Sequence, residues 1–171
     1  MEILLIIIIS VMSWMVFLFN RLVRDRNRVL SSWSDIDVQL KRRHDLIPKL
    51  VDAVKQYADY EVSTLESVTE LRKLDNNHLL TEGRVDLESR LGNEVQRIFA
   101  LAESYPDLKT NQSFLDLQQN ISDVEKHLQH ARRYYNGCVR NLNIRVESFP
   151  GLFIARLFSF SQAAFFELEE N

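Results

Sequence analysis

The stretch from Phe114 to Leu142 reads FLDLQQNISDVEKHLQHARRYYNGCVRNL, and its apolar side chains recur at alternating steps of three and four residues. Such spacing places the apolar side chains on one face of an α-helix, as in the seam of a coiled coil. A helix with this seam requires partner helices, so the stretch predicts a helical bundle. The seam residues are Phe114, Leu117, Ile121, Val124, Leu128, Ala131, Tyr135, Cys138 and Leu142.

A first long helix is predicted upstream, from Val29 to about Leu74. Apolar residues recur there mostly at steps of three, four or seven, and no glycine interrupts them. Pro48 lies inside the stretch, where a proline removes one helical hydrogen bond. Because the apolar pattern keeps its phase on both sides of Pro48, we expect a kink and not an end. The alternative is a separate helix that begins near Ser34, capped by that side chain.

The other helical segments are shorter. Residues 75–78 are typical of a loop, and a second helix is predicted from about Val85 to Glu103. Residues 149–151, Phe-Pro-Gly, end the seam helix. The apolar stretch 152–158 then predicts a short C-terminal helical segment.

The fold class that follows is all-α. The chain has only 4 Gly and 3 Pro among 171 residues, so few turns are available, and no stretch shows the sustained alternation of a strand. We expect an N-terminal transmembrane helix followed by an elongated antiparallel helical bundle, with three long helices and the short C-terminal segment. If the three long helices alternate in direction, the third runs away from the membrane and carries the C-terminus to the distal end.

The transmembrane prediction rests on Ile3 to Phe19, which carry no charge. Roughly 17 residues at a rise of about 1.5 Å span about 25 Å, near the lower limit for a bilayer core. Leu22 and Val23 extend the run, which gives an anchor over 1–23 and a helical domain over 24–171. A cleaved signal peptide is disfavoured because Glu2, and no basic residue, precedes the apolar run.

The charges that flank the anchor predict its orientation. Four arginines follow the apolar run and no Lys or Arg precedes it. The positive-inside rule then places the N-terminus outside and the C-terminal domain in the cytoplasm. The same arginines should lie near anionic membrane lipids. They are Arg21, Arg24, Arg26 and Arg28.

The segment from Ser32 to Pro48, SWSDIDVQLKRRHDLIP, resembles the signature of the LemA family. Further similarities follow in order along the chain, and they cover nearly all of it beyond the anchor. These are LESVT at 65–69, YPDLK at 105–109, FLDLQ at 114–118, ARRYYN at 131–136, the Phe149-Pro150 pair, and the aromatic C-terminus with FSF at 158–160 and FF at 165–166.

This resemblance implies a bacterial inner-membrane protein with an α-helical cytoplasmic domain. It implies no enzymatic activity, because none is established for the family. Some members are encoded beside a membrane-bound zinc metalloprotease, and some belong to magnetosome membranes. Both associations point to a membrane-organising or protease-adaptor role.

No residue pattern indicates a catalytic, cofactor or metal site. His127 and His130 lack the acid and the third ligand of a helical zinc motif, so we expect them on the helix surface. Cys138 lies on the seam and is expected to be a buried small hydrophobe. Ser31, Ser32 and Ser34 lack a base and are expected to be cap or surface residues. Acids slightly outnumber bases, which argues against a nucleic-acid partner.

Two groups of residues are candidates for interaction. The first is Lys41, Arg42, Arg43 and His44, a possible docking patch for an acidic partner or anionic lipid. Its structural interpretation is that Arg43 lies on the apolar stripe and pairs with Glu125 of the third helix, since a buried charge needs a partner. We favour the structural interpretation.

The second group is the aromatic C-terminus. Its phenylalanines either close the end of the bundle or form an exposed patch that binds a partner or another copy, and the sequence does not decide between these. The residues concerned are Phe158, Phe160, Phe165 and Phe166.

The function predicted from these features is a non-enzymatic, membrane-anchored scaffold that forms homo-oligomers or binds another membrane protein. The alternative is an adaptor or regulator of a membrane metalloprotease or envelope-stress system. An enzyme would require a site assembled from residues that we interpret as structural.

Overall fold

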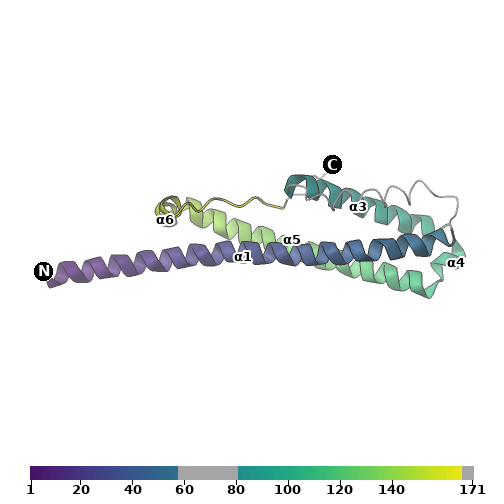
Figure 1. Cartoon of the computed structure of the whole chain (residues 1–171), viewed down its shortest axis with the longest axis horizontal. Helices are drawn as coiled ribbons and strands as arrows, with labels where there is room; N and C mark the ends of the chain where they lie inside the picture. The colour runs from purple at the N-terminus through teal and green to yellow at the C-terminus, as the bar shows by residue number, and fades with distance from the viewer. Residues whose placement is uncertain (58–80, 167–171) are drawn as a thin grey trace. The chain divides into compact units, whose positions relative to one another are not determined.

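The computed structural model describes residues 1–57 and 81–166, with residues 81–87 described by their backbone alone. Every regular element in these ranges is a helix, which confirms the all-α prediction. The helices are α1 (Glu2–Lys55), α3 (Thr81–Ala102), α4 (Pro106–Lys109), α5 (Gln112–Glu147) and α6 (Gly151–Leu157) (Figure 1).

Helix α1 runs for 54 residues from the apolar N-terminal run through Pro48 to Lys55. The apolar stripe that keeps its phase explains this continuity, since Ile36, Leu40 and Ile47 are all buried. The expectation that the helix continues past Pro48 is confirmed. The alternative of a new helix near Ser34 is wrong, because the Ser34 hydroxyl donates back to the Leu30 carbonyl inside α1, at 3.2 Å. Residues 58–78, which include the predicted end of this helix and the loop after it, lie outside the described ranges.

The described residues form two compact units, each with a core of its own. The first unit comprises residues 1–36 and 130–166, and the second comprises 37–129. Because α1 and α5 are long, each contributes one part to the first unit and its other part to the second.

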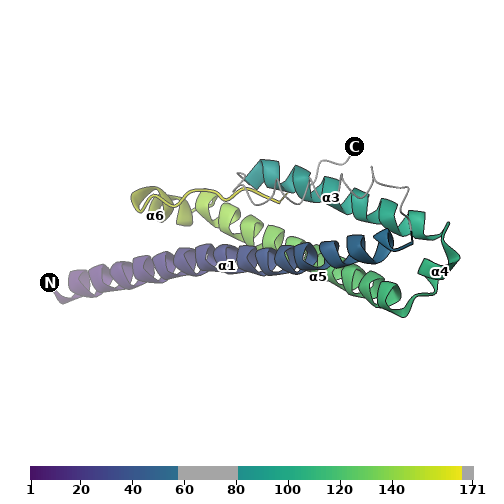
Figure 2. The same cartoon turned by 45° about the vertical axis from the view of Figure 1, so that its right-hand side comes forward.

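The core of the second unit lies between α1, α3, α4 and the first half of α5. Helix α3 runs beside α1 in the same direction, and α5 runs opposite to both (Figures 1 and 2). The Phe99 and Phe114 rings, 6.3 Å apart, join α3 to α5. The buried side chains of this core are Ile47, Leu50, Val51, Val54, Leu91, Val95, Ile98, Ala102, Leu108, Phe114 and Ile121.

The core of the first unit lies between α1, the second half of α5, and α6. Seven of the nine seam residues predicted on α5 are at least nine-tenths buried, whereas Leu117 and Ala131 are half-buried. The buried residues are Phe114, Ile121, Val124, Leu128, Tyr135, Cys138 and Leu142. Residues from α1 (Leu22, Val29, Ile36) and from α6 (Ile154, Ala155) complete the core of the first unit.

The C-terminal segment after α6 folds back along α5 and is fastened there by side chains. Asn143 exchanges two hydrogen bonds with the backbone of Ala163, and Asn136 does the same with Phe166. The Tyr135 hydroxyl donates to the Ala164 carbonyl at 2.9 Å.

The expectation that α5 carries the C-terminus away from the apolar run is wrong. The Phe158 ring lies 4.7 Å from the Phe19 ring, and the Phe160 ring lies 5.9 Å from it. The three long helices do not alternate in direction, because α3 runs in the same direction as α1. Helix α5 is therefore the one that runs back toward the apolar run (Figure 1). The segment that connects α1 to α3 lies mostly outside the described residues.

Candidate functional site

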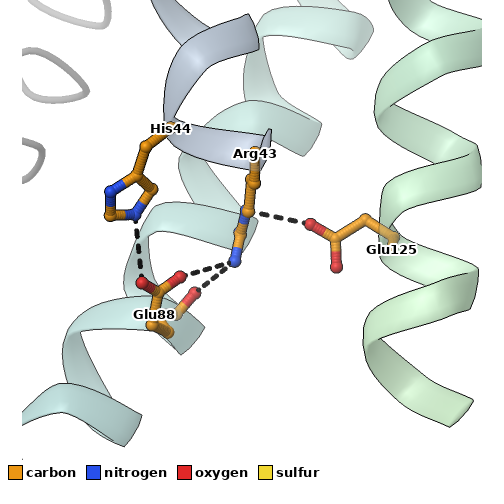
Figure 3. A network of polar contacts seen from close by, with 4 residues as sticks. All are labelled: Arg43, His44, Glu88 and Glu125. Atoms are coloured by element: carbon orange, nitrogen blue, oxygen red, sulfur yellow. Dashed lines mark hydrogen bonds and ion pairs between the residues drawn. The ribbon is translucent and has the colours of Figure 1, made fainter. Parts of the chain in front are cut away.

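A cluster of buried charges joins the three long helices of the second unit, α1, α3 and α5. Arg43 and His44 come from α1, Glu88 comes from α3, and Glu125 comes from α5 (Figure 3). Arg43 occupies a position on the apolar stripe of α1, so its side chain points into the bundle. The exposed fraction of both the Arg43 and Glu88 side chains is 1%.

The guanidinium of Arg43 contacts both other helices. Its Nη1 lies 2.9 Å from Glu88 Oε2 and 3.2 Å from the Glu88 carbonyl oxygen. Its Nε lies 2.9 Å from Glu125 Oε1. The second carboxylate oxygen of Glu88 lies 3.0 Å from His44 Nε2. The cluster therefore places two carboxylates and a backbone carbonyl around one buried cation.

Gly92 makes room for this cluster on α3. A Cβ atom at position 92 would lie 2.8 Å from Arg43 Nη2, which is closer than such contacts allow. A glycine inside a helix costs about 1 kcal/mol relative to alanine, so the close approach of the guanidinium gives it a structural purpose.

The cluster shows which residues of the basic motif at 41–44 have a structural role. The predicted Arg43–Glu125 pair is confirmed. Arg43 is too deeply buried to contact a partner directly, and His44 is mostly buried, whereas Lys41 and Arg42 are exposed. A docking role for the motif therefore remains a prediction for Lys41 and Arg42. Glu88 was not predicted, although it lies one turn before Leu91 on the buried face of α3.

A second group of charges lies in the first unit, around Asp25. The Asp25 side chain is 5% exposed and is paired with Arg145 of α5 and, at 3.7 Å, with Arg28 of α1. Beside it is a hollow of about 340 Å³ in which Asp25 is the only acid among the lining residues. The hollow is lined by Phe17, Asn20, Arg21, Arg24, Asp25, Arg28 and Arg145.

The electrostatics of this hollow favour an anion. Burial lowers the pKa of the Arg145 guanidinium from its usual value, and Asp25 opposes that change. The positive charges of the three nearby α1 arginines lower the pKa of Arg145 further, which means that like charges face one another there. All four arginines of the predicted membrane flank are exposed. Three of them, Arg21, Arg24 and Arg28, line the hollow, and Arg26 does not line it.

The comparisons with known proteins identify the family. The model of the LemA family matches residues 32–171. The chain belongs to the LemA family. It is 28% identical over 152 residues to Protein LemA of Metamycoplasma hominis, covering 88% of this chain and 69% of the relative. It is 20% identical over 194 aligned residues to the magnetosome protein MamQ of Magnetospirillum gryphiswaldense, covering 95% of this chain and 71% of the relative. Magnetosome protein MamQ 1 of Paramagnetospirillum magneticum is 21% identical with the same coverage.

The segments that carry the LemA resemblance supply interior contacts within each of the two units. The first, Ser32–Pro48, supplies Arg43 and His44 to the buried cluster. The segment at 131–136 supplies Tyr135 and Asn136, which fasten the C-terminal segment. These LemA motif residues therefore stabilise the packing inside the unit to which each belongs.

The aromatic C-terminus of this LemA chain divides between core and surface. Phe166 is 5% exposed, with its ring 6.0 Å from the Trp33 ring and 4.6 Å from the Arg132 guanidinium carbon. Phe160 is half-buried, whereas Phe158 and Phe165 are 49% and 41% exposed. Both interpretations of the tail thus apply, each to different residues.

The remaining residues considered in the sequence analysis are the histidines of α5, Cys138 and the serines of α1. His127 and His130 are exposed on α5 and Cys138 is buried, as predicted. Ser32 is buried, so the expectation of a cap or surface residue is wrong, and its hydroxyl donates to the Val29 carbonyl at 2.9 Å instead. Within the described residues, no group of histidine, cysteine and acidic side chains could hold a metal ion.

Proposed function

We propose that this LemA-family chain is a non-enzymatic scaffold anchored in the bacterial inner membrane, which binds protein partners at the cytoplasmic face. The observation that carries the proposal is the continuity of α1. Among the described helices, it alone is long and apolar enough to cross a membrane, and the same helix continues into both units. Because no loop separates the apolar run from the helical domain, the first unit is held next to the bilayer and is not tethered on a linker.

The buried charges support a structural role over catalysis. A catalytic acid or base needs access to a substrate, and Arg43 and Glu88 are enclosed and paired with each other. Their arrangement is suited to fixing the register of three helices.

The arginines around Asp25 support the orientation. They follow the apolar run, where the positive-inside rule expects cytoplasmic charge, and they line a hollow with an excess of positive charge. Phospholipid headgroups of the cytoplasmic leaflet are the anions available at that level.

The similarity of this chain to magnetosome proteins agrees with a role in organising membrane proteins. The exposed Lys41 and Arg42 offer a basic contact for an acidic partner, and the exposed Phe165 offers an apolar one. Either surface suits a homo-oligomer or another membrane protein.

Photo-crosslinking of the full chain in native membranes tests the proposal. A crosslinking amino acid replaces Arg42 in one variant and Phe165 in another, with Lys126, an exposed lysine of α5, as the matched control. We expect crosslinks from position 42 or 165 to a second copy or to a defined protein, and none from position 126. A complex with a membrane protease would favour the adaptor role. A monomer that forms no crosslink from either position would contradict the scaffold.

A further inference from the structure

The C-terminal helix α6 presents an apolar face that the rest of the first unit leaves uncovered. The exposed fractions are 78% for Phe149, 64% for Phe153 and 67% for Leu157. These residues are four apart, so Phe153 and Leu157 share one face of α6, and the Phe149 ring lies 5.9 Å from the Phe153 ring. Large apolar side chains gathered in this way mark a surface that is covered by something else.

The opposite face of α6 is fixed, so the helix cannot turn these side chains inward. Ile154 and Ala155 are buried in the first unit. A Cβ atom at Gly151 would lie 2.3 Å from the Arg145 carbonyl oxygen, which shows how closely the start of α6 packs on the end of α5. The exposed face is thus set by packing.

Two contacts give the level of α6 along the anchor. Phe158, directly after the helix, lies against Phe19, the last residue of the uncharged run. Arg145, shortly before the helix, pairs with Asp25, six residues or about 9 Å beyond Phe19 along α1. Helix α6 therefore lies beside the stretch of α1 where the apolar run gives way to arginines (Figure 2).

We propose that the apolar face of α6, made by Phe149, Phe153 and Leu157, is a second membrane contact that lies in the boundary between headgroups and acyl chains. The inference rests on the proposed anchoring by α1. The occupant is lipid because the Phe158–Phe19 contact places α6 at the level where the anchor ends, and the apolar residues of the anchor from Ile3 to Phe17 are mostly exposed as well. An interfacial helix of this kind buries its apolar side about 5–10 Å into the bilayer. The arginine-lined hollow in the same unit supplies the cationic groups that accompany such helices at an anionic surface.

Depth-dependent fluorescence quenching tests the proposal on the full chain. In a Cys138→Ala background, single cysteines at Phe153 and Leu157 carry an environment-sensitive fluorophore, and the protein is placed in nanodiscs of phosphatidylethanolamine and phosphatidylglycerol. The anchor control is Ile8→Cys. The surface control is Tyr134→Cys, an exposed aromatic on α5 roughly 15 residues or about 20 Å before Phe149. Thermal unfolding of each variant verifies its fold.

We expect acyl-chain spin labels to quench the probes at 153 and 157 at least about twofold more than the probe at 134, and iodide to show the reverse order. Probes at 153 and 157 that iodide quenches as strongly as the probe at 134, with the probe at 8 quenched by lipid, would overturn the α6 contact and leave the anchor intact. Protection of 153 and 157 from both quenchers would also overturn it, since a protein then covers the face. A probe at 8 that lipid does not quench would overturn the anchor itself.

Discussion

Arg43 in the second unit and Arg145 in the first unit both form an ion pair with a buried carboxylate, yet their surroundings differ. Arg43 is 1% exposed and meets two carboxylates, whereas Arg145 is 22% exposed and shares one carboxylate with Arg28. In the second unit the cation is enclosed and faces two carboxylates. In the first unit the carboxylate is enclosed, and positive charge is left over at the surface.

The difference shows that two properties decide whether a charged group can bind a ligand. These are its burial and the number of opposite charges around it. An enclosed cluster whose cation is paired contributes to helix register and leaves no cationic group for a partner. An excess of arginine around a single acid remains attractive to anions, because the neighbouring guanidiniums repel one another.

The largest effect is expected from breaking the enclosed cluster. Arg43→Met leaves Glu88 buried without its cation, and we expect it to lower the free energy of unfolding by about 3–5 kcal/mol. Thermal and urea unfolding followed by circular dichroism measure this. Arg42→Met, at the exposed neighbouring position, is the matched control and should change stability by less than about 0.5 kcal/mol. Equal effects at both positions would mean that Arg43 is not buried as described.

A charge swap sharpens the same point. Arg43→Glu combined with Glu125→Arg would be expected to restore a simple pair. Here it should fail to restore stability, since the Arg43→Glu carboxylate would face Glu88. Full recovery in the double variant would show that Glu88 contributes little.

A smaller loss is expected in the first unit. Arg145→Gln leaves the buried Asp25 with only the more distant Arg28 among its described cationic partners, and we expect a loss of about 1–2 kcal/mol in the free energy of unfolding. The control is Arg140→Gln, at an exposed position of the same helix, with a change under about 0.5 kcal/mol. A loss as large as that of Arg43→Met would erase the distinction between the two units.

Substitution of alanine for glycine is expected to lower the stability of the fold at position 92 and to raise it at position 137. Gly92→Ala places a methyl group against the pinned Arg43 guanidinium, so we expect it to destabilise the fold by about 1 kcal/mol despite the better helix propensity of alanine. Gly137→Ala meets nothing within 4 Å and should stabilise α5 by up to about 1 kcal/mol. Melting temperatures of the two variants measure the difference, and stabilisation by both would place Arg43 away from Gly92.

The smallest effect on stability is expected from the surplus arginines. Arg21→Gln and Arg24→Gln should leave the melting temperature nearly unchanged, because both side chains are exposed. Each should weaken the retention of phosphatidylglycerol by about fivefold, which corresponds to about 1 kcal/mol per basic residue at the membrane surface. Native mass spectrometry of detergent-extracted protein measures the bound lipid, with Arg140→Gln as control. Unchanged lipid retention would mean that the excess charge serves only solubility.

Much of the fold follows from periodicity. The seam from Phe114 to Leu142 predicted a buried helical face, and the burial of Cys138 followed from its place on that seam. The sequence predicts the Arg43–Glu125 pair because Arg43 lies on the apolar stripe of the first helix and Glu125 lies beside Val124 of the seam. The sequence does not predict the contact of Glu88 with Arg43. The apolar pattern of α1 does not determine how α3 is rotated about its own axis, and that rotation decides which α3 side chains face Arg43.

The sequence by itself determined the uncharged run, the helical class and the family, because these depend on side-chain type and spacing along one helix. Only the tertiary structure decided that α3 runs in the same direction as α1, that α5 returns to Phe19, and that Gly92 leaves space for Arg43. Those properties arise from contacts between residues far apart in the chain, where the direction of each helix and the volume between helices decide which side chains meet.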